Sequence, residues 1–247
     1  MFYKIFFFLI NLFPKVKRFA WKLWYNFISS RFKEDNFKFM NYGYSNSDFH
    51  PLLSLEDENE RYPIQLYHYL ASKLSIENLD VVEVGSGRGG GASYIAKKFN
   101  PKSICGIDIS STAIDLCNKL YNQNNLSFLT GDSENLPFSD NSIDIVFNVE
   151  SSHCYPSMFN FVDEVSRVLK PGGYFVYCDL LLAKDYDEHI QKLSNNKIDL
   201  ISFTDISSNV IQASELMTES RKKLINNSSS GLLKKVLFSF ASVKGSK

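Results

Sequence analysis

The sequence has few of the features that mark secreted, zinc-binding or nucleic-acid-binding proteins. Its 247 residues include only four cysteines, Cys105, Cys117, Cys154 and Cys178, and no C-x-x-C pair. We therefore expect buried free thiols in a reducing compartment instead of disulfides or a zinc site. Neither sign of charge is in excess, because 27 basic residues balance 27 acidic ones. This balance argues against nucleic acid as a partner.

Long apolar segments are also lacking. Residues 5–13 are nearly all apolar, but they are about half as long as a helix that crosses a bilayer. They could form the apolar core of a secretory signal, yet Lys15, Lys17 and Arg18 follow where a small-residue cleavage site is expected. The content of 44% hydrophobic and 22% charged residues excludes collagen-like, disordered and multi-span membrane classes. The length suits one α/β domain with extensions.

Positive charge and aromatic side chains are concentrated at the N-terminus. Residues 1–40 hold eight basic and two acidic side chains, a sum of +6, so the remainder carries −6. They also hold 14 of the 36 aromatic residues and both tryptophans. Within this arm, five apolar residues recur at the i, i+3/i+4 spacing of one side of a helix: Val16, Phe19, Ala20, Leu23 and Phe27.

Three interpretations of the arm follow from this pattern. A basic helix with an aromatic-rich apolar side is typical of an interfacial anchor, here on an anionic membrane through residues 1–30. The same helix could instead be a lid that packs on the body of the protein, and one helix could serve both purposes. A cleaved or spanning signal is the third interpretation. On the first, the protein is cytoplasmic and peripherally membrane-associated.

A regular α/β pattern begins after the arm. Val81–Val84 is a short apolar strand that continues into the glycine-rich loop Gly85–Gly91, and a helix is expected over residues 92–99. A second strand, residues 104–109, precedes a helix over residues 111–121 that Ser110 can cap. This order predicts the first half of a doubly wound, mostly parallel sheet.

The glycine loop and the acid that follows predict a nucleotide site. Glycines let the backbone approach a ligand where a Cβ would collide, and the following helix presents free N–H groups. Asp108, at the end of the second strand, can accept two ribose hydroxyls. Gly85, Gly87 and Gly90 satisfy G-x-G-x-x-G, a weak pattern shared with dinucleotide enzymes, so these residues leave the cofactor open.

Three further features complete a recognisable series. Glu83 lies inside the first strand, where a carboxylate is costly unless it holds the loop or a ligand cation. An acidic loop, residues 131–138, ends in Leu-Pro-Phe, and a strand over 142–148 and a helix over 158–169 follow. Lys-Pro-Gly-Gly then precedes a strand over 174–178. The whole series resembles class I S-adenosylmethionine-dependent methyltransferases, which implies their Rossmann-like α/β fold.

The resemblance implies a site for S-adenosylmethionine, with S-adenosylhomocysteine as product and no metal. It assigns nine residues to the cofactor: Glu83, Gly85, Gly87, Gly89, Asp108, Ile109, Asp132, Ser133 and Asn148. The three glycines form the floor under the methionine part, steered by Glu83, and Asp108 binds the ribose. Ile109 packs on adenine, while Asp132 and the Ser133 N–H bind the ring's polar edge. Asn148 positions the amino group. Alternatively, Ile109 is plain core and Asn148 a strand-end hydrogen bonder.

Further motifs resemble one subgroup, the phthiotriolone/phenolphthiocerol dimycocerosate O-methyltransferases and relatives that act on lipids and polyketides. The shared segments are Asn41–Tyr44, Leu66–His68, Gly89–Tyr94, Asn148–Pro156, Pro171–Phe175 with Asp179, and Asp205–Val210. Sterol C-methyltransferases are the neighbouring family, with a comparable Glu…His segment. The similarity covers roughly residues 40–215.

A mechanism for O-methylation follows from this resemblance. His153 is the best candidate for the base, because an ordinary imidazole pKa of about 6.5 suits proton transfer near neutrality. Glu150 could orient the imidazole or act as the base, and Tyr44 and Tyr155 would wall the acceptor pocket. The alternative is that Glu150 and His153 are structural.

The expected organisation has four segments. These are an arm (1–39), a lead-in or lid helix (40–75), the cofactor-binding core (76–180) and a C-terminal substrate-side region (181–247). Leu237–Gly245 resembles the sixth strand of the fold, and the family's final antiparallel strand is missing after it.

The leading hypothesis is therefore O-methylation of a hydroxyl on a hydrophobic lipid or polyketide at a membrane surface. One alternative is C-methylation of a sterol-like alkene, with Glu150 stabilising a carbocation. The other is a membrane-attached protein that binds the cofactor but has lost turnover.

Overall fold

A computed structural model describes residues 14–31, 37–182, 186–195, 198–228, 231, 234, 237 and 238. These residues form two compact units. The first comprises described residues of 1–33 and 74–203 and contains the sheet, and the second comprises those of 34–73 and 204–247 and is helical. How the segments predicted from the sequence divide into functional domains stays a prediction.

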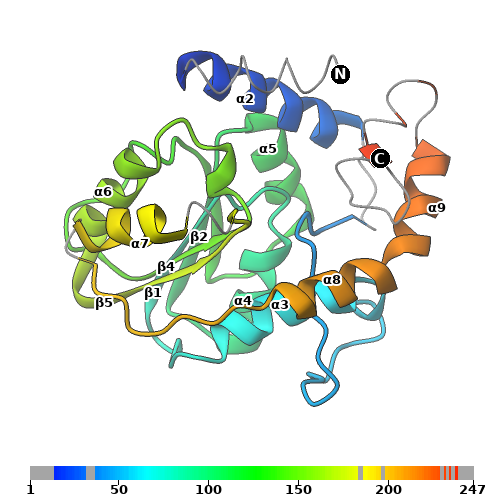
Figure 1. Ribbon diagram of the computed structural model, residues 1–247, viewed down its shortest axis with the longest axis horizontal. Coiled ribbons are helices and arrows are strands. Elements are labelled where there is room, and N and C mark those ends of the chain that lie inside the picture. The colour runs from blue at the N-terminus through cyan, green and yellow to red at the C-terminus, as the bar shows by residue number, and fades with distance from the viewer. Residues whose placement is uncertain are drawn as a thin grey trace. The chain divides into compact units, whose positions relative to one another are not determined.

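A parallel sheet in the order β3-β2-β1-β4-β5 organises the first unit (Figure 1). Its strands are β1 (Asp80–Val84), β2 (Ser103–Asp108), β3 (Leu126–Thr130), β4 (Ile143–Val149) and β5 (Leu169–Cys178). All four strand pairs are parallel, and β5 shifts register by a bulge against β4 at Ile143/Ile145. The predicted Rossmann-like α/β fold is confirmed, and the described residues contain no antiparallel strand.

Helices follow β1, β2 and β4, whereas a loop joins β3 to β4, as the sequence patterns predict. Those of the first unit are α2 (Pro14–Arg31), α4 (Gly90–Phe99), α5 (Ser111–Leu120), η2 (Ser152–Cys154), α6 (Met158–Val168) and α7 (Tyr186–Asn195). Ser110 caps α5 as expected, because its Oγ accepts the Ala113 N–H at 3.1 Å. This cap replaces a hydrogen bond that the first turn of a helix cannot make internally.

The core of the first unit lies between the sheet and α6. Val82 and Val146 of the central strands are fully buried, as are Phe161 and Val165 of the helix. The i, i+1, i+4, i+7 spacing of apolar residues in α6 places them on one side of the helix. This side packs on the sheet face formed by every second side chain of the strands. Burial of such side chains contributes about 1.5–3 kcal/mol each, so this layer holds the strand ends in place.

The second unit contains η1 (Glu58–Glu60), α3 (Arg61–Ala71), α8 (Ser207–Leu216) and α9 (Thr218–Ser228). Arg221 Nη2 donates to the Asn41 carbonyl at 3.1 Å and Asn209 Nδ2 to the Ser45 carbonyl at 2.8 Å. These bonds join segments that are distant in the sequence.

The strand predicted at 237–245 is wrong for its first two residues, because Leu237 and Phe238 are helical. Residues 239–245 lie outside the described part of the chain. A short apolar run fits a helix or a strand equally well by spacing alone. Leu237 is nonetheless buried, as an apolar residue in either element would be.

No helix among the described residues is both long and apolar enough to cross a bilayer. The four cysteines are free thiols, as predicted. Cys117 and Cys154 are also buried as expected, whereas Cys105 and Cys178 are half-buried.

Candidate functional site

The carboxyl ends of β1, β2 and β4 meet at one edge of the sheet. β1 pairs with β2 on one side and with β4 on the other. The connection from β1 therefore leads to one side of the sheet and the connection to β4 leads to the other, so the strand order reverses at this point. In open α/β sheets, loops that leave such a switch point diverge and leave space for a ligand. Most of the predicted site residues of the first unit lie in these loops.

The glycine loop follows β1 and has the backbone that only glycine adopts easily. Gly85, Gly87 and Gly89 have positive φ angles of 79°, 52° and 77°. A Cβ on Gly85 would lie 2.3 Å from Ser151 Oγ and 2.6 Å from the Tyr155 hydroxyl oxygen. The loop therefore needs glycine here for both conformation and space.

Asp108 joins the second strand to this loop. Its Oδ2 accepts the Gly87 N–H at 2.8 Å, and its Oδ1 accepts the Ser110 N–H at 2.9 Å. Burial raises the pKa of the carboxyl, and these backbone bonds oppose the rise. Asp108, the residue predicted to bind the ribose, is thus fixed beside the glycine loop.

Two fully buried charged residues flank the loop. Glu83 is in β1 with no exposed surface, and Arg88 lies within the loop with 1% exposed. Both act on the buried Cys117 thiol. Burial most of all, and then the charges of Asp108 and Glu83, raise its pKa, Arg88 lowers it, and the combined result is a pKa of about 12. Sequence reasoning singled out Glu83 but missed Arg88. The signal was present, because a cation inside Gly-Ser-Gly-Arg-Gly-Gly-Gly is conspicuous.

Asn148 lies at the end of β4 in a small polar cluster. Its Nδ2 is 2.9 Å from the Val84 carbonyl oxygen, 2.8 Å from Ser151 Oγ and 2.9 Å from the Tyr155 hydroxyl. The carbonyl only accepts, so it identifies Nδ2 and fixes the direction of the amide. Asn148 Oδ1 is buried and accepts no hydrogen bond from the described residues.

This buried acceptor is the feature that fits the cofactor. An unsatisfied buried oxygen costs about 1–3 kcal/mol, and an ammonium group would supply the missing donor. Tyr155 contributes its hydroxyl to the same cluster and packs edge-on against Phe161. Burial raises its pKa well above the ordinary value, so it stays neutral. Tyr155 thus lies beside the glycine loop.

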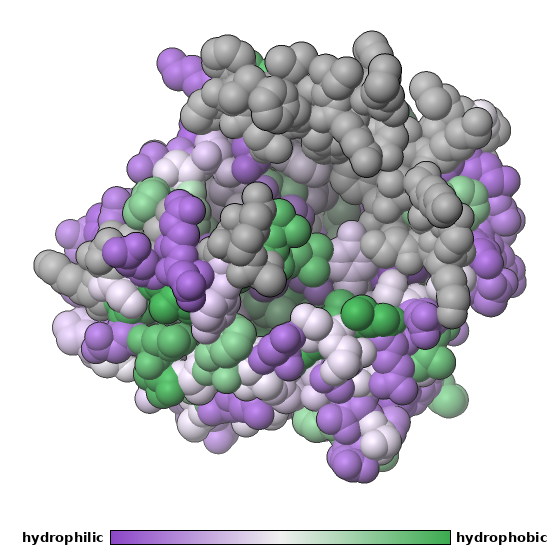
Figure 2. All heavy atoms as spheres, in the orientation of Figure 1, coloured by the Kyte–Doolittle hydropathy of each residue, from purple (hydrophilic) through white to green (hydrophobic). Residues whose placement is uncertain are grey.

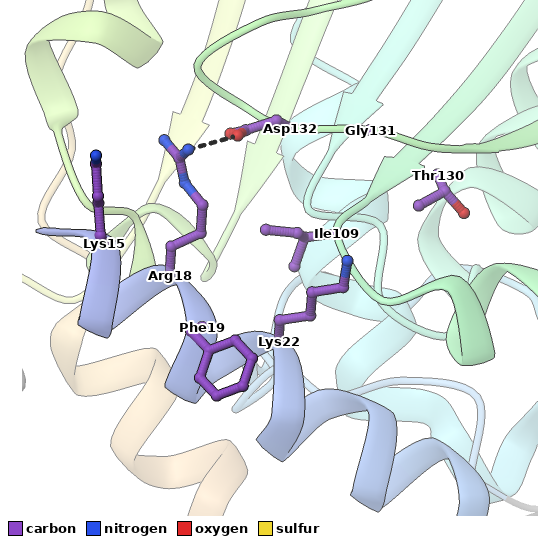
Figure 3. Close-up of a pocket in the computed structure, with 8 residues that line it drawn as sticks. All are labelled: Lys15, Arg18, Phe19, Lys22, Ile109, Thr130, Gly131 and Asp132. Atoms are coloured by element: carbon purple, nitrogen blue, oxygen red, sulfur yellow. Dashed lines mark ion pairs between the residues drawn. The ribbon is translucent and has the colours of Figure 1, made fainter.

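A cavity of about 330 Å³ opens next to the carboxyl ends of β2 and β3 (Figure 3). Its walls come from two parts of the first unit: Ile109, Thr130, Gly131 and Asp132 from the strand ends, and Lys15, Arg18, Phe19 and Lys22 from α2. Asp132 begins a tight turn, closed by the Asn135 N–H on its carbonyl at 3.0 Å, and Ser133 lies within that turn. Ile109 and Asp132, the predicted adenine contacts, thus share one cavity.

Arg18 reaches from α2 into this cavity, a contact that the sequence did not indicate. Its Nη1 lies 3.2 Å from Asp132 Oδ2 and its Nη2 2.5 Å from Glu134 Oε2. The helix also contacts Ser110, whose Oγ donates to Asn26 Oδ1 at 2.7 Å, and Cys154, whose Sγ is 3.5 Å from the Tyr25 hydroxyl. The helix therefore packs across the loops that follow β2, β3 and β4.

His153, in η2 after β4, is held by Asp179, which follows β5. The His153 Nδ1 and Asp179 Oδ1 atoms are 2.6 Å apart. Burial lowers the pKa of His153, but the hydrogen bond and charge of Asp179, with Cys154, outweigh it and raise the pKa to about 10. The imidazole is therefore a cation at neutral pH.

Glu150 leaves β4 in a left-handed conformation with φ of 48°, and its N–H donates to the Cys178 carbonyl at 2.7 Å. A non-glycine residue held there marks local strain. The described carboxylate at the His153 ring is Asp179, so the orienting role of Glu150 stays a prediction.

Tyr44 belongs to the second unit, where it stacks on Tyr69 with ring centroids 4.5 Å apart. Its role at the acceptor pocket also stays a prediction.

The methyltransferase domain family matches residues 82–177. The chain is 40% identical over 223 residues to the fatty-acid O-methyltransferase of Mycolicibacterium smegmatis, covering 89% of this chain and 81% of that one. It is 33% identical over 227 residues to the phthiotriol/phenolphthiotriol dimycocerosates methyltransferase of Mycobacterium leprae, covering 92% and 84%. This chain belongs to their family, the S-adenosylmethionine-dependent methyltransferases. The resemblance seen in the sequence is confirmed.

Solved structures share the fold of this methyltransferase. A candidate sarcosine dimethylglycine methyltransferase from Galdieria sulphuraria has a TM-score of 0.68 at 16% identity, covering 87% of this chain and 90% of that one. A geranyl diphosphate methyltransferase, solved with GPP and sinefungin, has a TM-score of 0.64 at 14% identity, covering 92% and 94%. Among the described residues, no three side chains that could hold a metal ion come together.

Proposed function

We propose that this methyltransferase methylates an oxygen atom of a hydrophobic lipid acceptor. The observation that carries the proposal is the segment from Asn148 to Tyr155. It combines the buried acceptor Asn148 Oδ1, suited to the cofactor's ammonium, with the His153 ring a few residues away. The names of the relatives, which specify a fatty acid and phthiotriols, support a lipid acceptor.

Each residue has a distinct task in this proposal. S-Adenosylmethionine, when bound, supplies an electrophilic methyl group on a sulfonium sulfur. Asn148 and the loop from Gly85 to Gly89 hold its methionine part, and Asp108 holds its ribose. The remaining requirement is alignment of the acceptor oxygen, together with removal of its proton if that oxygen is a hydroxyl. His153 Nε2 accepts that proton.

Exposed apolar side chains on the first unit support a lipid acceptor. Leu180, Leu181 and Leu182 directly follow Asp179 and are 48%, 40% and 63% exposed. Figure 2 shows further apolar side chains along the segment after α7, where Ile201 is 77% and Phe203 56% exposed. Apolar surface close to a reactive group suits an alkyl chain.

The pKa of His153 makes the acceptor class testable. Because that pKa is about 10, only about one ring in a thousand is neutral at pH 7. We expect the turnover of a hydroxyl acceptor to rise about tenfold for each pH unit from 7 to 9, since the neutral fraction rises in that proportion. A carboxylic acid is already ionised, so its methylation should stay nearly flat over the same range.

The test uses methyl-labelled cofactor with a long-chain alcohol, the matching fatty acid and a sterol alkene, followed by mass spectrometry of the product. We expect label on oxygen in the alcohol or the acid. His153→Gln should lower turnover of the alcohol at least a hundredfold near pH 9 and leave cofactor binding intact. Label on carbon only would establish C-methylation. Tight S-adenosylhomocysteine binding without any methyl transfer would mean that turnover is lost.

We also propose that α2 attaches the enzyme to an anionic membrane surface. Its apolar row is turned to solvent: Val16, Phe19, Leu23 and Phe27 are 49%, 63%, 52% and 43% exposed. Lys15 and Lys22 flank that row, and both are exposed. Arg18, Tyr25 and Asn26 on the same helix instead contact the loops of the first unit. The helix is thus suited to act as lid and anchor at once.

A further inference from the structure

Asp179 is a buried carboxylate surrounded by donors. Its side chain has no exposed surface. Oδ1 accepts the Leu180 N–H at 2.7 Å and faces His153 Nδ1, while Oδ2 accepts from Ser152 Oγ at 2.5 Å and from the His153 N–H at 3.1 Å. Burial raises the pKa of the carboxyl. The hydrogen bond and charge of His153, together with the hydrogen bonds from Ser152 and Leu180, lower it by more, so the net pKa is below the ordinary value. Asp179 is therefore ionised at neutral pH.

The carboxylate holds more than the imidazole ring. It also binds the backbone of His153 and the side chain of Ser152, whose Oγ lies 2.8 Å from the Tyr177 hydroxyl of β5. One residue after β5 thereby fixes the whole η2 turn after β4. With Nδ1 engaged, Nε2 is the ring nitrogen left to take a proton from a substrate.

We propose that Asp179 is a positioning residue for methyl transfer, which fixes the His153 ring and selects the tautomer in which Nε2 can accept the acceptor's proton. The inference rests on the proposed function. A carboxylate that binds a neutral imidazole needs a proton on Nδ1, because the carboxylate can only accept. Glu150, the partner suggested by the sequence, is not required for this task.

Other titratable groups surround the pair. Cys154 of η2 forms a hydrogen bond with the ring. Burial raises the pKa of Tyr177 and Cys178 of β5 most, and both lie close enough to Asp179 for its charge to raise it further. Lys17 comes from α2. Burial lowers the pKa of Lys17, while Cys154, Asp179 and Glu134 oppose that shift. These groups remain in an Asp179 variant, so a change in His153 titration would report the loss of the carboxylate.

The first test is nitrogen NMR of ¹⁵N-histidine in the full chain with S-adenosylhomocysteine bound. His153→Gln identifies the His153 signal. We expect Nδ1 to keep its proton while Nε2 titrates, and Asp179→Asn to move the midpoint down by more than about one pH unit, towards the ordinary value of about 6.5. Asp179→Glu should restore most of the shift. Ser152→Ala keeps the carboxylate, so its midpoint should stay within about half a unit. An unchanged midpoint in a folded Asp179→Asn protein would overturn the proposal.

The second test is the pH dependence of kcat with a saturating alcohol acceptor. In Asp179→Asn, the rising limb should move to lower pH, and the plateau at high pH should fall at least about tenfold because orientation is lost. The acceptor KM should change less than about threefold. A lower plateau with an unmoved limb would indicate a purely structural role and contradict the inference. If the unmodified enzyme methylates no acceptor, the proposed function fails, while the NMR titration still decides the role of Asp179.

Discussion

Gly85 and Gly172 have nearly the same backbone conformation but opposite surroundings. Their φ angles are 79° and 80°. A Cβ on Gly85 would collide with Ser151 and Tyr155, whereas a Cβ on Gly172 would meet nothing within 4 Å. The pair therefore separates the two reasons for a glycine, conformational strain and lack of space.

We expect Gly85→Ala to weaken S-adenosylhomocysteine binding at least about tenfold, because the loop and the Asn148 cluster must move apart. Gly172→Ala should leave that affinity unchanged. Gly172→Ala should lose about 1 kcal/mol of stability from the left-handed backbone alone, and Gly85→Ala should lose more, because the collision adds to the same backbone strain. Isothermal titration calorimetry and thermal melting measure the two effects. Equal affinity in the two variants would contradict this view of the loop.

At the scale of elements, α2 has two sides with different surroundings. One side inserts Arg18 into the cavity beside Asp132, and Phe19 at the edge of that side also lines the cavity. The other side exposes the rest of the apolar row, which includes Leu23 and Phe27. The row is what an interfacial anchor needs, and the inward contacts are what a lid needs. The lid and anchor interpretations of the sequence are therefore compatible in one helix.

The double variant Leu23→Ser with Phe27→Ser should lose most of its co-sedimentation with anionic liposomes, because apolar area buried in the interface drives such binding. Its stability should change by less than about 0.5 kcal/mol per site, since both side chains are exposed. Leu129→Ser is the control, because Leu129 of β3 is 46% exposed against 52% for Leu23. Unchanged sedimentation of the double variant would remove the anchor proposal.

At the scale of the whole molecule, the His153–Asp179 pair links stability to pH. The pKa of His153 is about 10 in the folded protein, above its ordinary value, so this contribution is complete below about pH 6.5 and is lost as pH rises through 10. The pKa of Asp179 is lowered on folding, so its contribution is present above about pH 4 and is lost as pH falls. Together they give a window of full stabilisation between about pH 4 and 6.5.

We therefore expect the free energy of unfolding of the unmodified enzyme to exceed that of His153→Gln most between about pH 4.5 and 6.5. The difference should shrink steadily towards pH 10, where the ring loses its charge. Urea unfolding of both proteins across this range gives the difference directly and cancels the titration of unrelated groups. A difference that is constant with pH would show that the pair is uncharged.

Much of the first unit could be predicted from the sequence. Short apolar strands, capped helices and a glycine loop are local patterns, and the predicted strand from Val81 and the cap at Ser110 are present in the structure. Asp108 could also be predicted, because the acid at the end of the second strand has a fixed place relative to the loop. The strand predicted from Leu237 was wrong where it is described, since an apolar run without periodicity does not distinguish strand from helix.

The sequence by itself determined the order of the sheet elements, the cofactor loop and the family, because each depends on residues close together in the chain. The tertiary structure decided which side chains meet. His153 contacts Asp179, 26 residues away, and Arg18 contacts Glu134, 116 residues away. Spacing cannot show such pairs, since they arise only when parallel strands bring their carboxyl ends to one edge and a helix packs across it. The same packing left the apolar row of α2 exposed to solvent. The spacing of these apolar residues in the sequence would have fitted a helix side buried against the protein equally well.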